Sequence, residues 1–121
     1  MTNSDNLMIA AVKAQVSFRV NGRSVGVDNE KTVVRLFDRE IMRLYFSDGV
    51  LRLNGETPVS RKSARVMNAL LKEFTTYEVL SRERQWMLRD TMSGALMPMA
   101  GMAVTVPVRQ SPERFIEGCA I

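Results

Sequence analysis

Two dipeptides, Asn21-Gly22 and Asp48-Gly49, constrain the fold of this chain more than any other feature. Each follows a stretch in which apolar and polar residues alternate, which is the pattern of a strand with one buried face. Asn-Gly and Asp-Gly favour the two-residue turns of β-hairpins because both turn residues adopt positive φ angles. The sequence therefore predicts antiparallel hairpins over residues 15–27 and 41–54. A further strand is expected at 32–37, followed by a turn at 38–40.

The two turns also predict which residues lie opposite each other. In the first hairpin the expected pairs are Val20 with Arg23, Phe18 with Val25, and Val16 with Val27. In the second hairpin they are Phe46 with Leu51, Leu44 with Leu53, and Tyr45 with Arg52, with Arg43 beside Tyr45. This register gathers apolar side chains on one face and leaves a polar, solvated face, as antiparallel sheets commonly do.

One long helix is predicted after the second hairpin. Ser60 is a favourable N-cap, and a helix from there to about Thr75 has a distinct apolar side. That side consists of Ala64, Met67, Leu70, Leu71 and Phe74. The other side carries Arg61, Arg65, Asn68 and Lys72, within about 60° of the helix circumference. We therefore expect the helix to pack its apolar side on the apolar face of the sheet.

The segment after this helix predicts more strands. Residues 77–89 fit a hairpin around Arg82-Glu83 with Val79 opposite Trp86, and a helix is the alternative. The glycines and the proline of residues 93–101 predict a loop. Residues 102–108 alternate like a strand, and Pro107 places that strand at a sheet edge because proline donates no ladder hydrogen bond.

The ends of the chain predict small elements around a single domain of residues 1–121. Residues 1–12 form either a flexible arm or one short helical turn, and residues 109–121 form a short C-terminal helix or tail. The predicted fold class is α+β: an antiparallel β-sheet of successive hairpins, with one main helix packed on its apolar face and a short C-terminal helix.

The residue content removes several kinds of chemistry. The chain has no histidine and one cysteine, Cys119. A Ser-His-Asp or Cys-His pair, a histidine-ligated zinc ion and an internal disulfide are therefore excluded. No nucleotide-binding glycine loop or EF-hand pattern is present. We expect a protein that is not an enzyme and has no cofactor or metal. Without a signal peptide or a membrane-spanning apolar stretch, we expect it in the cytoplasm and not in a membrane.

Arginine dominates the positive charge. The net charge is +4, and 13 of the 17 basic residues are arginine, whose forked guanidinium donors suit phosphate oxygens. On the predicted helix, a basic stripe extends along about 16 Å, enough to span several phosphates of DNA or RNA. This helix stripe consists of Arg61, Arg65, Asn68 and Lys72. The sequence therefore favours a small nucleic-acid-binding domain, with the helix stripe as the first candidate site.

A second candidate site lies on the polar face of the second hairpin. There, Arg43, Tyr45 and Arg52 combine two guanidinium groups with an aromatic ring. Nucleobases stack on such rings while arginines hold the phosphate backbone. The alternative is an ordinary solvated face on which arginine packs against tyrosine. Because the helix covers the apolar face, the two candidate sites should lie on opposite sides of the sheet.

A methionine-rich segment supports a different function. Five of the nine methionines lie between residues 87 and 102. Methionine adapts to irregular partner surfaces, and an edge strand can pair with another chain. The predicted interface residues are Leu96, Met97, Met99, Met102 and Val104. In this alternative the chain is a protein-interaction module. One form of this alternative is an inhibitor or adaptor of another macromolecule, such as an accessory protein of a phage or mobile element. The other form is a structural subunit that forms a homodimer or larger homo-oligomer.

Overall fold

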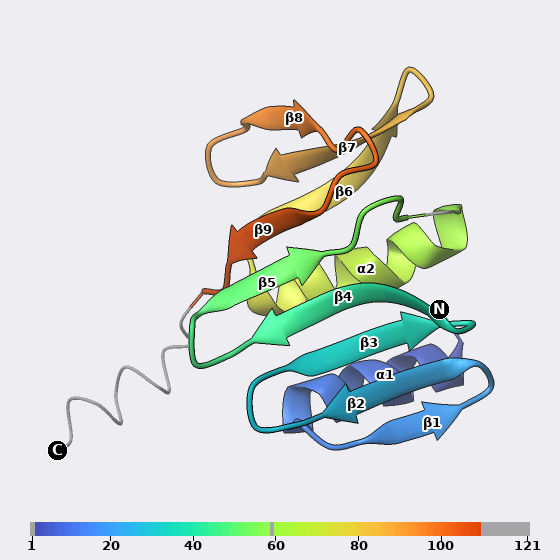
Figure 1. The fold of residues 1–121 in the computed structure, drawn as a ribbon. Coiled ribbons are helices and arrows are strands. Elements are labelled where there is room, and N and C mark those ends of the chain that lie inside the picture. The colour runs from blue at the N-terminus through green and yellow to red at the C-terminus, as the bar shows by residue number, and fades with distance from the viewer. Residues whose placement is uncertain (1, 59, 110–121) are drawn as a thin grey trace, which may run out of the picture.

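The computed structural model describes residues 2–58 and 60–109, which form two antiparallel sheets and two helices (Figure 1). The larger sheet has six strands in the spatial order β1-β2-β3-β4-β5-β9. They are β1 (Phe18–Val20), β2 (Arg23–Val27), β3 (Thr32–Leu36), β4 (Arg39–Tyr45), β5 (Val50–Leu53) and β9 (Val104–Pro107). The smaller sheet has the order β6 (Tyr77–Arg82), β7 (Gln85–Asp90) and β8 (Leu96–Pro98). The α+β class predicted from the sequence is confirmed, although the strands form two sheets.

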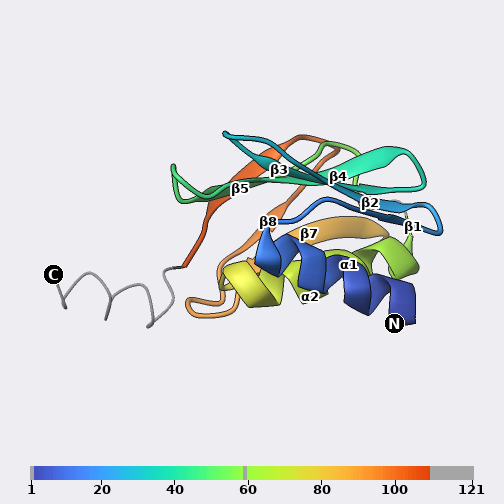
Figure 2. The same ribbon diagram turned by 90° about the horizontal axis from the view of Figure 1, so that it is seen from below.

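The helices α1 (Asn3–Ala14) and α2 (Arg61–Phe74) both lie on one face of the six-stranded sheet (Figure 2). No described element covers the opposite face, which is turned toward the viewer in Figure 1. We call this uncovered face the open face. The three-stranded sheet lies beside α2, which contacts β6. The layers therefore separate the open face from the outer surface of α2.

Helix α2 confirms the main helix predicted from the sequence. Ser60 is its N-cap: the Ser63 backbone N–H donates to the Ser60 hydroxyl, and the Ser60 backbone N–H donates to the Ser63 hydroxyl, both at 3.1 Å. Its buried side chains include Ala64, Met67, Leu70 and Leu71, and they share one core with Met42, Leu44, Leu51 and Leu53 of the sheet. Full burial of one leucine or methionine side chain stabilises the fold by about 1.5–3 kcal/mol.

The N-terminal segment is a capped helix of 12 residues, so the prediction of a flexible arm or a single turn for residues 1–12 is wrong. The Asp5 N–H donates to the Thr2 hydroxyl and the Thr2 N–H donates to the Asp5 carboxylate, each at 3.1 Å. Met8 and Val12 are fully buried. Arg23 Nε on β2 donates to Asp5 Oδ1 at 2.6 Å, and both side chains are almost completely buried, 7% and 3% exposed. This ion pair attaches α1 to the sheet.

The first hairpin has the predicted turn, and its pairs Val20–Arg23 and Phe18–Val25 are confirmed. Asn21 and Gly22 both have positive φ angles, as the Asn-Gly turn requires. The strand begins only at Phe18, so the predicted pair of Val16 with Val27 lies outside the ladder.

The register predicted for the second hairpin is wrong by two residues. Leu44 lies opposite Leu51, and Arg43 rather than Tyr45 lies opposite Arg52. The physical reason is the length of the turn. It occupies the four residues 46–49, and the Gly49 N–H donates to the Phe46 carbonyl at 3.2 Å.

The smaller sheet begins with a hairpin at 77–90, so the hairpin prediction is confirmed and the helical alternative is excluded. Its register also differs by two residues from the predicted one, because the turn is formed by Glu83 and Arg84, which have positive φ angles. Val79 therefore lies opposite Leu88, not Trp86.

The methionine-rich segment contains a strand that the sequence did not predict. Residues 93–101 were expected to form a loop, yet Leu96–Pro98 pairs with β7 as β8. The edge position predicted for the strand around Pro107 is confirmed by β9, which pairs with β5. The C-terminal helix expected within 109–121 lies outside the described residues, except for Arg109.

Candidate functional site

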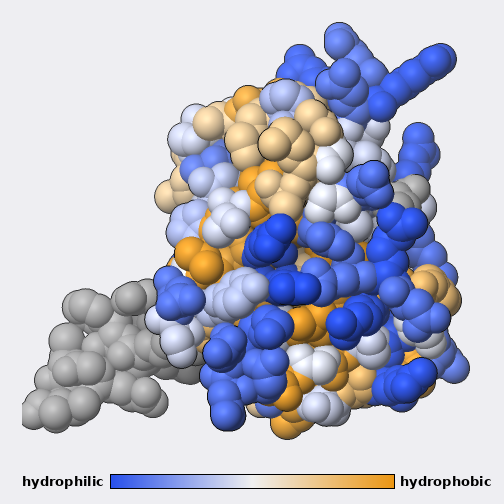
Figure 3. Space-filling model, in the orientation of Figure 1, coloured by the Kyte–Doolittle hydropathy of each residue, from blue (hydrophilic) through white to orange (hydrophobic). Residues whose placement is uncertain are grey.

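The open face of the six-stranded sheet gathers arginine side chains from four strands. Strand pairing aligns Arg43 on β4 with Arg52 on β5, and Arg35 on β3 with Glu40 on β4. Arg19 on β1 lies in the same row as Arg35. Figure 3 shows hydrophilic side chains spread over the middle strands of this face. Glu40 is the one acidic residue within the six strands, so four arginines share one carboxylate.

Two of these arginines lie directly opposite each other. Arg43 and Arg52 are cross-strand partners, an arrangement in which like charges destabilise a sheet. Arg43 Nε donates to Glu40 Oε1 at 2.9 Å, whereas the exposed Arg52 makes no ion pair with any described residue. A side-chain hydrogen bond with Tyr45, and next the Glu40 carboxylate, raise the pKa of Arg43 above its usual value. Among the described residues, Glu40 therefore neutralises Arg43, and Arg52 has no counter-ion.

The helix stripe is divided between two roles. Arg61, Arg65 and Lys72 are exposed on α2. The Asn68 amide is engaged with the free edge of β6: Nδ2 donates to the Val79 carbonyl at 2.9 Å, and Oδ1 accepts from the Val79 N–H at 2.7 Å. Asn68 thus attaches α2 to the smaller sheet, and its amide is not free to read a base edge. The stripe belongs to α2, on the side of the molecule away from the open face (Figure 2).

The predicted interface residues of the methionine-rich segment also separate. Met97 and Met102 are exposed, and Met102 is the more exposed at 68%. Leu96 and Val104 are half-buried. Met99 belongs to the core and is only 3% exposed, so it offers no surface to a partner. The structure therefore leaves Met97 and Met102 as the methionines from this set that a partner can reach.

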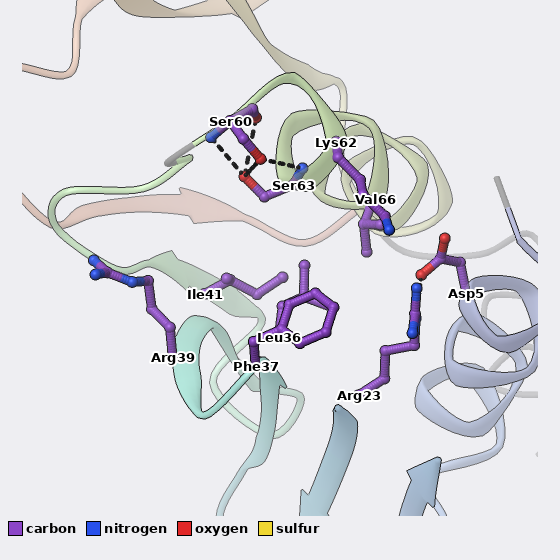
Figure 4. Close-up of a pocket in the computed structure, with 10 residues that line it drawn as sticks. All are labelled: Asp5, Arg23, Leu36, Phe37, Arg39, Ile41, Ser60, Lys62, Ser63 and Val66. Atoms are coloured by element: carbon purple, nitrogen blue, oxygen red, sulfur yellow. Dashed lines mark hydrogen bonds and ion pairs between the residues drawn. The ribbon is translucent and has the colours of Figure 1, made fainter. Parts of the chain in front are cut away.

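A cavity that the sequence did not predict lies at the turn between β3 and β4 (Figure 4). Leu36 pairs with Arg39, so the turn consists of Phe37 and Asp38 and not of residues 38–40. The cavity has a volume of about 140 Å³. It is lined by Leu36, Phe37, Ile41 and Val66, together with Asp5, Arg23, Arg39, Ser60, Lys62 and Ser63. The one sequence signal for this cavity is Phe37, the aromatic residue directly before Asp38. The same residue fits equally well at the end of the predicted strand.

Among residues 2–58 and 60–109, no group of three or more His, Cys, Asp or Glu side chains could hold a metal ion. Within that same part of the chain, no helix is long and apolar enough to cross a membrane. Comparison with protein-family models, curated proteins and solved structures yielded no match to this chain. The open face, the helix stripe, the exposed methionines and the cavity are therefore the candidate sites.

Proposed function

We propose that this protein is a non-enzymatic nucleic-acid-binding domain of the cytoplasm that binds single-stranded DNA or RNA on the open face. The observation that carries the proposal is the Arg43–Arg52 pair, in which two arginines lie directly opposite each other on adjacent strands. A phosphate between them replaces their repulsion with charge-assisted hydrogen bonds. Tyr45, which is hydrogen-bonded to Arg43, supplies an aromatic ring on the same face for base stacking.

The open face is a better candidate than the helix stripe for two reasons. The stripe loses Asn68 to the edge of β6, which leaves three cations on one helix. The open face carries four arginines and one carboxylate on β1, β3, β4 and β5, so it offers a comparable net charge together with the aromatic ring of Tyr45. A flat sheet face also suits an extended strand whose backbone follows a charged surface.

The test is the salt dependence of binding, measured by fluorescence anisotropy with labelled single-stranded DNA, single-stranded RNA and duplex DNA. The variant is Arg43→Gln with Arg52→Gln. The matched control is Arg61→Gln with Arg65→Gln, which removes the same charge from the other side of the molecule. If each open-face arginine neutralises one phosphate of a single strand, the slope of log K against log salt flattens by about 1.4 in the open-face variant.

The outcomes separate the two surfaces. The proposal expects weaker binding and a flatter slope in the open-face variant only, with single strands bound more tightly than duplex. A flatter slope only in the control moves the site to the helix stripe. Equal affinity of the wild type and both variants, or no binding at low salt, refutes nucleic-acid binding by these arginines. The open-face variant should fold, because removing Arg52 relieves like-charge repulsion.

The exposed methionines support a second candidate function, self-association through β8 and the segment before β9. Met97 lies in β8 and Met102 lies just before β9, both strands are at sheet edges, and both methionine side chains are exposed. Size-exclusion chromatography with light scattering should then show a dimer that persists at high salt. Met97→Asp with Met102→Asp should yield a folded monomer. A monomeric wild type, or a dimer in the variant, would exclude this function.

A further inference from the structure

Phe37 occupies a position that local backbone energetics disfavour. It is the first residue of a two-residue turn and has a φ of 50°, and Asp38 follows at 65°. Glycine and asparagine populate this left-handed region readily, whereas a bulky residue there is a conformational outlier. The ring is also 63% exposed. Neither local conformation nor burial explains a phenylalanine at this turn, and such outliers are found preferentially at binding sites.

The surrounding structure holds the Phe37 ring in place. The Phe37 N–H donates to the Gly22 carbonyl. A Cβ atom at Gly22 would lie 2.6 Å from a ring carbon, so only glycine there leaves room for the ring. The guanidinium carbon of Arg23 lies 5.6 Å from the ring centroid and Lys62 Nζ lies 5.9 Å from it, within the range of cation–π attraction. The ring is thus fixed as one wall of the cavity.

The size of the cavity indicates what it can accept. Leu36, Ile41 and Val66 provide apolar surface beside Phe37 (Figure 4). The volume of about 140 Å³ is close to that of apolar protein cavities of about 150 Å³ that bind benzene. One aromatic ring or one branched aliphatic side chain therefore fits.

The charge at the mouth of the cavity indicates the surroundings of that side chain. Asp5 is the one carboxylate in the lining, and it is buried and engaged by Arg23 at 2.6 Å. Lys62 and Arg39 are exposed and form no ion pair with any other described residue. The N-terminal turn of α2, which carries a partial positive charge, also borders the cavity through Ser60. The free charge among the lining residues is therefore positive.

We propose that this cavity is the docking site for an acidic peptide segment of another protein. The segment inserts one aromatic or branched aliphatic side chain between Phe37 and the apolar lining. Its neighbouring carboxylates pair with Lys62 and Arg39. This site does not depend on nucleic-acid binding, because the residues that carry the two proposals are different.

The experiment is a selection of displayed random short peptides on the wild-type protein, followed by affinity measurements with the selected peptides. The apolar part of the site is tested by Phe37→Asn, which suits the left-handed turn and should fold. The charged part is tested by Lys62→Glu with Arg39→Glu. The matched control is Arg82→Glu with Arg84→Glu, which changes the same charge at the exposed tip of the β6–β7 hairpin.

The expected result is enrichment of peptides in which an aromatic or branched aliphatic residue is flanked by Asp or Glu. Their affinity should fall by about tenfold for Phe37→Asn and for the Lys62/Arg39 variant. It should not change for the hairpin-tip control or for the Arg43/Arg52 variant, so failure here is distinct from failure of the proposed function. The proposal is overturned if no peptide is enriched, if the enriched peptides lack this pattern, or if Phe37→Asn binds them as tightly as the wild type.

Discussion

Replacing Asp5 by asparagine should strongly destabilise the protein, because Arg23 would then be a buried cation without a counter-ion. The two side chains are 3% and 7% exposed and lie 2.6 Å apart. Removing one partner of a buried ion pair costs about 3–5 kcal/mol. The Asn21 carbonyl, which accepts from Arg23 Nη1 at 2.6 Å, is neutral and offsets only part of that loss. Asparagine keeps an oxygen that can accept from the Thr2 N–H, but its NH2 group then faces Arg23 Nε, so the variant removes both the charge and the hydrogen bond to Arg23.

The assay is urea unfolding at neutral pH, monitored by circular dichroism. Natural domains of this kind have unfolding free energies of about 5–15 kcal/mol, so the expected loss is a large fraction of the total. With a urea dependence of about 2 kcal/mol per molar, the unfolding midpoint should fall by about 2 M. Asp28→Asn serves as the control. Its exposed carboxylate pairs with Lys31 at 3.3 Å, and its removal should shift the midpoint far less.

A double variant makes the reasoning refutable. Asp5→Leu with Arg23→Met removes both charges and keeps apolar volume, so it should recover most of the stability that the single variant loses. A loss of less than about 1 kcal/mol for Asp5→Asn, or a double variant less stable than the single one, would show that Arg23 does not need Asp5 as a counter-ion.

The pKa of Asp5, the Asn68 amide and the Phe37 turn each predict a measurable effect on stability. Burial alone would raise the pKa of Asp5, but hydrogen bonds from Arg23 and Thr2 outweigh it and lower that pKa. The contribution of ionised Asp5 to the free energy of unfolding should therefore be complete above a pH of about 4, and it should be lost as the pH falls through the lowered pKa of the folded state. Acid unfolding of the wild type should then be steeper than acid unfolding of Asp5→Asn. Asn68→Ala leaves the N–H and carbonyl of the buried Val79 without their partner, so chemical denaturation should show a loss of about 1–3 kcal/mol, and a loss below this range would contradict the role of that amide. Phe37→Asn relieves the left-handed backbone but loses the ring contacts, so the unfolding free energy should change by less than about 1 kcal/mol, whereas a much larger loss would make the ring a structural element.

The sequence predicted elements more reliably than their register, and the reason is geometric. In both the second hairpin and the β6–β7 hairpin the true register differs from the predicted one by two residues. Side chains alternate between faces with a period of two, so this error leaves every residue on its predicted face. The buried face and the α+β class were therefore predictable. The Arg43–Arg52 pair was not, because it depends on the length of the turn at 46–49.

Other features depend on partners that are distant in the sequence. The capping spacing of Thr2 and Asp5 before an apolar stretch is a local signal for α1, but the burial of Asp5 depends on Arg23, 18 residues away. Asn68 has the same polar character as its neighbours on the helix stripe, and only the position of β6 shows that its amide is occupied. The exposure of Arg61, Arg65 and Lys72 depends on no distant partner, so helical periodicity alone predicted it correctly.

The bonds between Asn68 and Val79 also bear on how the protein avoids aggregation. An uncovered outer strand offers unpaired N–H and carbonyl groups to any other extended chain. At Val79 those two groups are already taken by a side chain of α2, so the amide acts as a one-residue substitute for a neighbouring strand. The protection lasts only while α2 is folded against β6. Asn68→Ala would therefore leave the two backbone groups of Val79 open to pairing with another extended chain at the edge of β6.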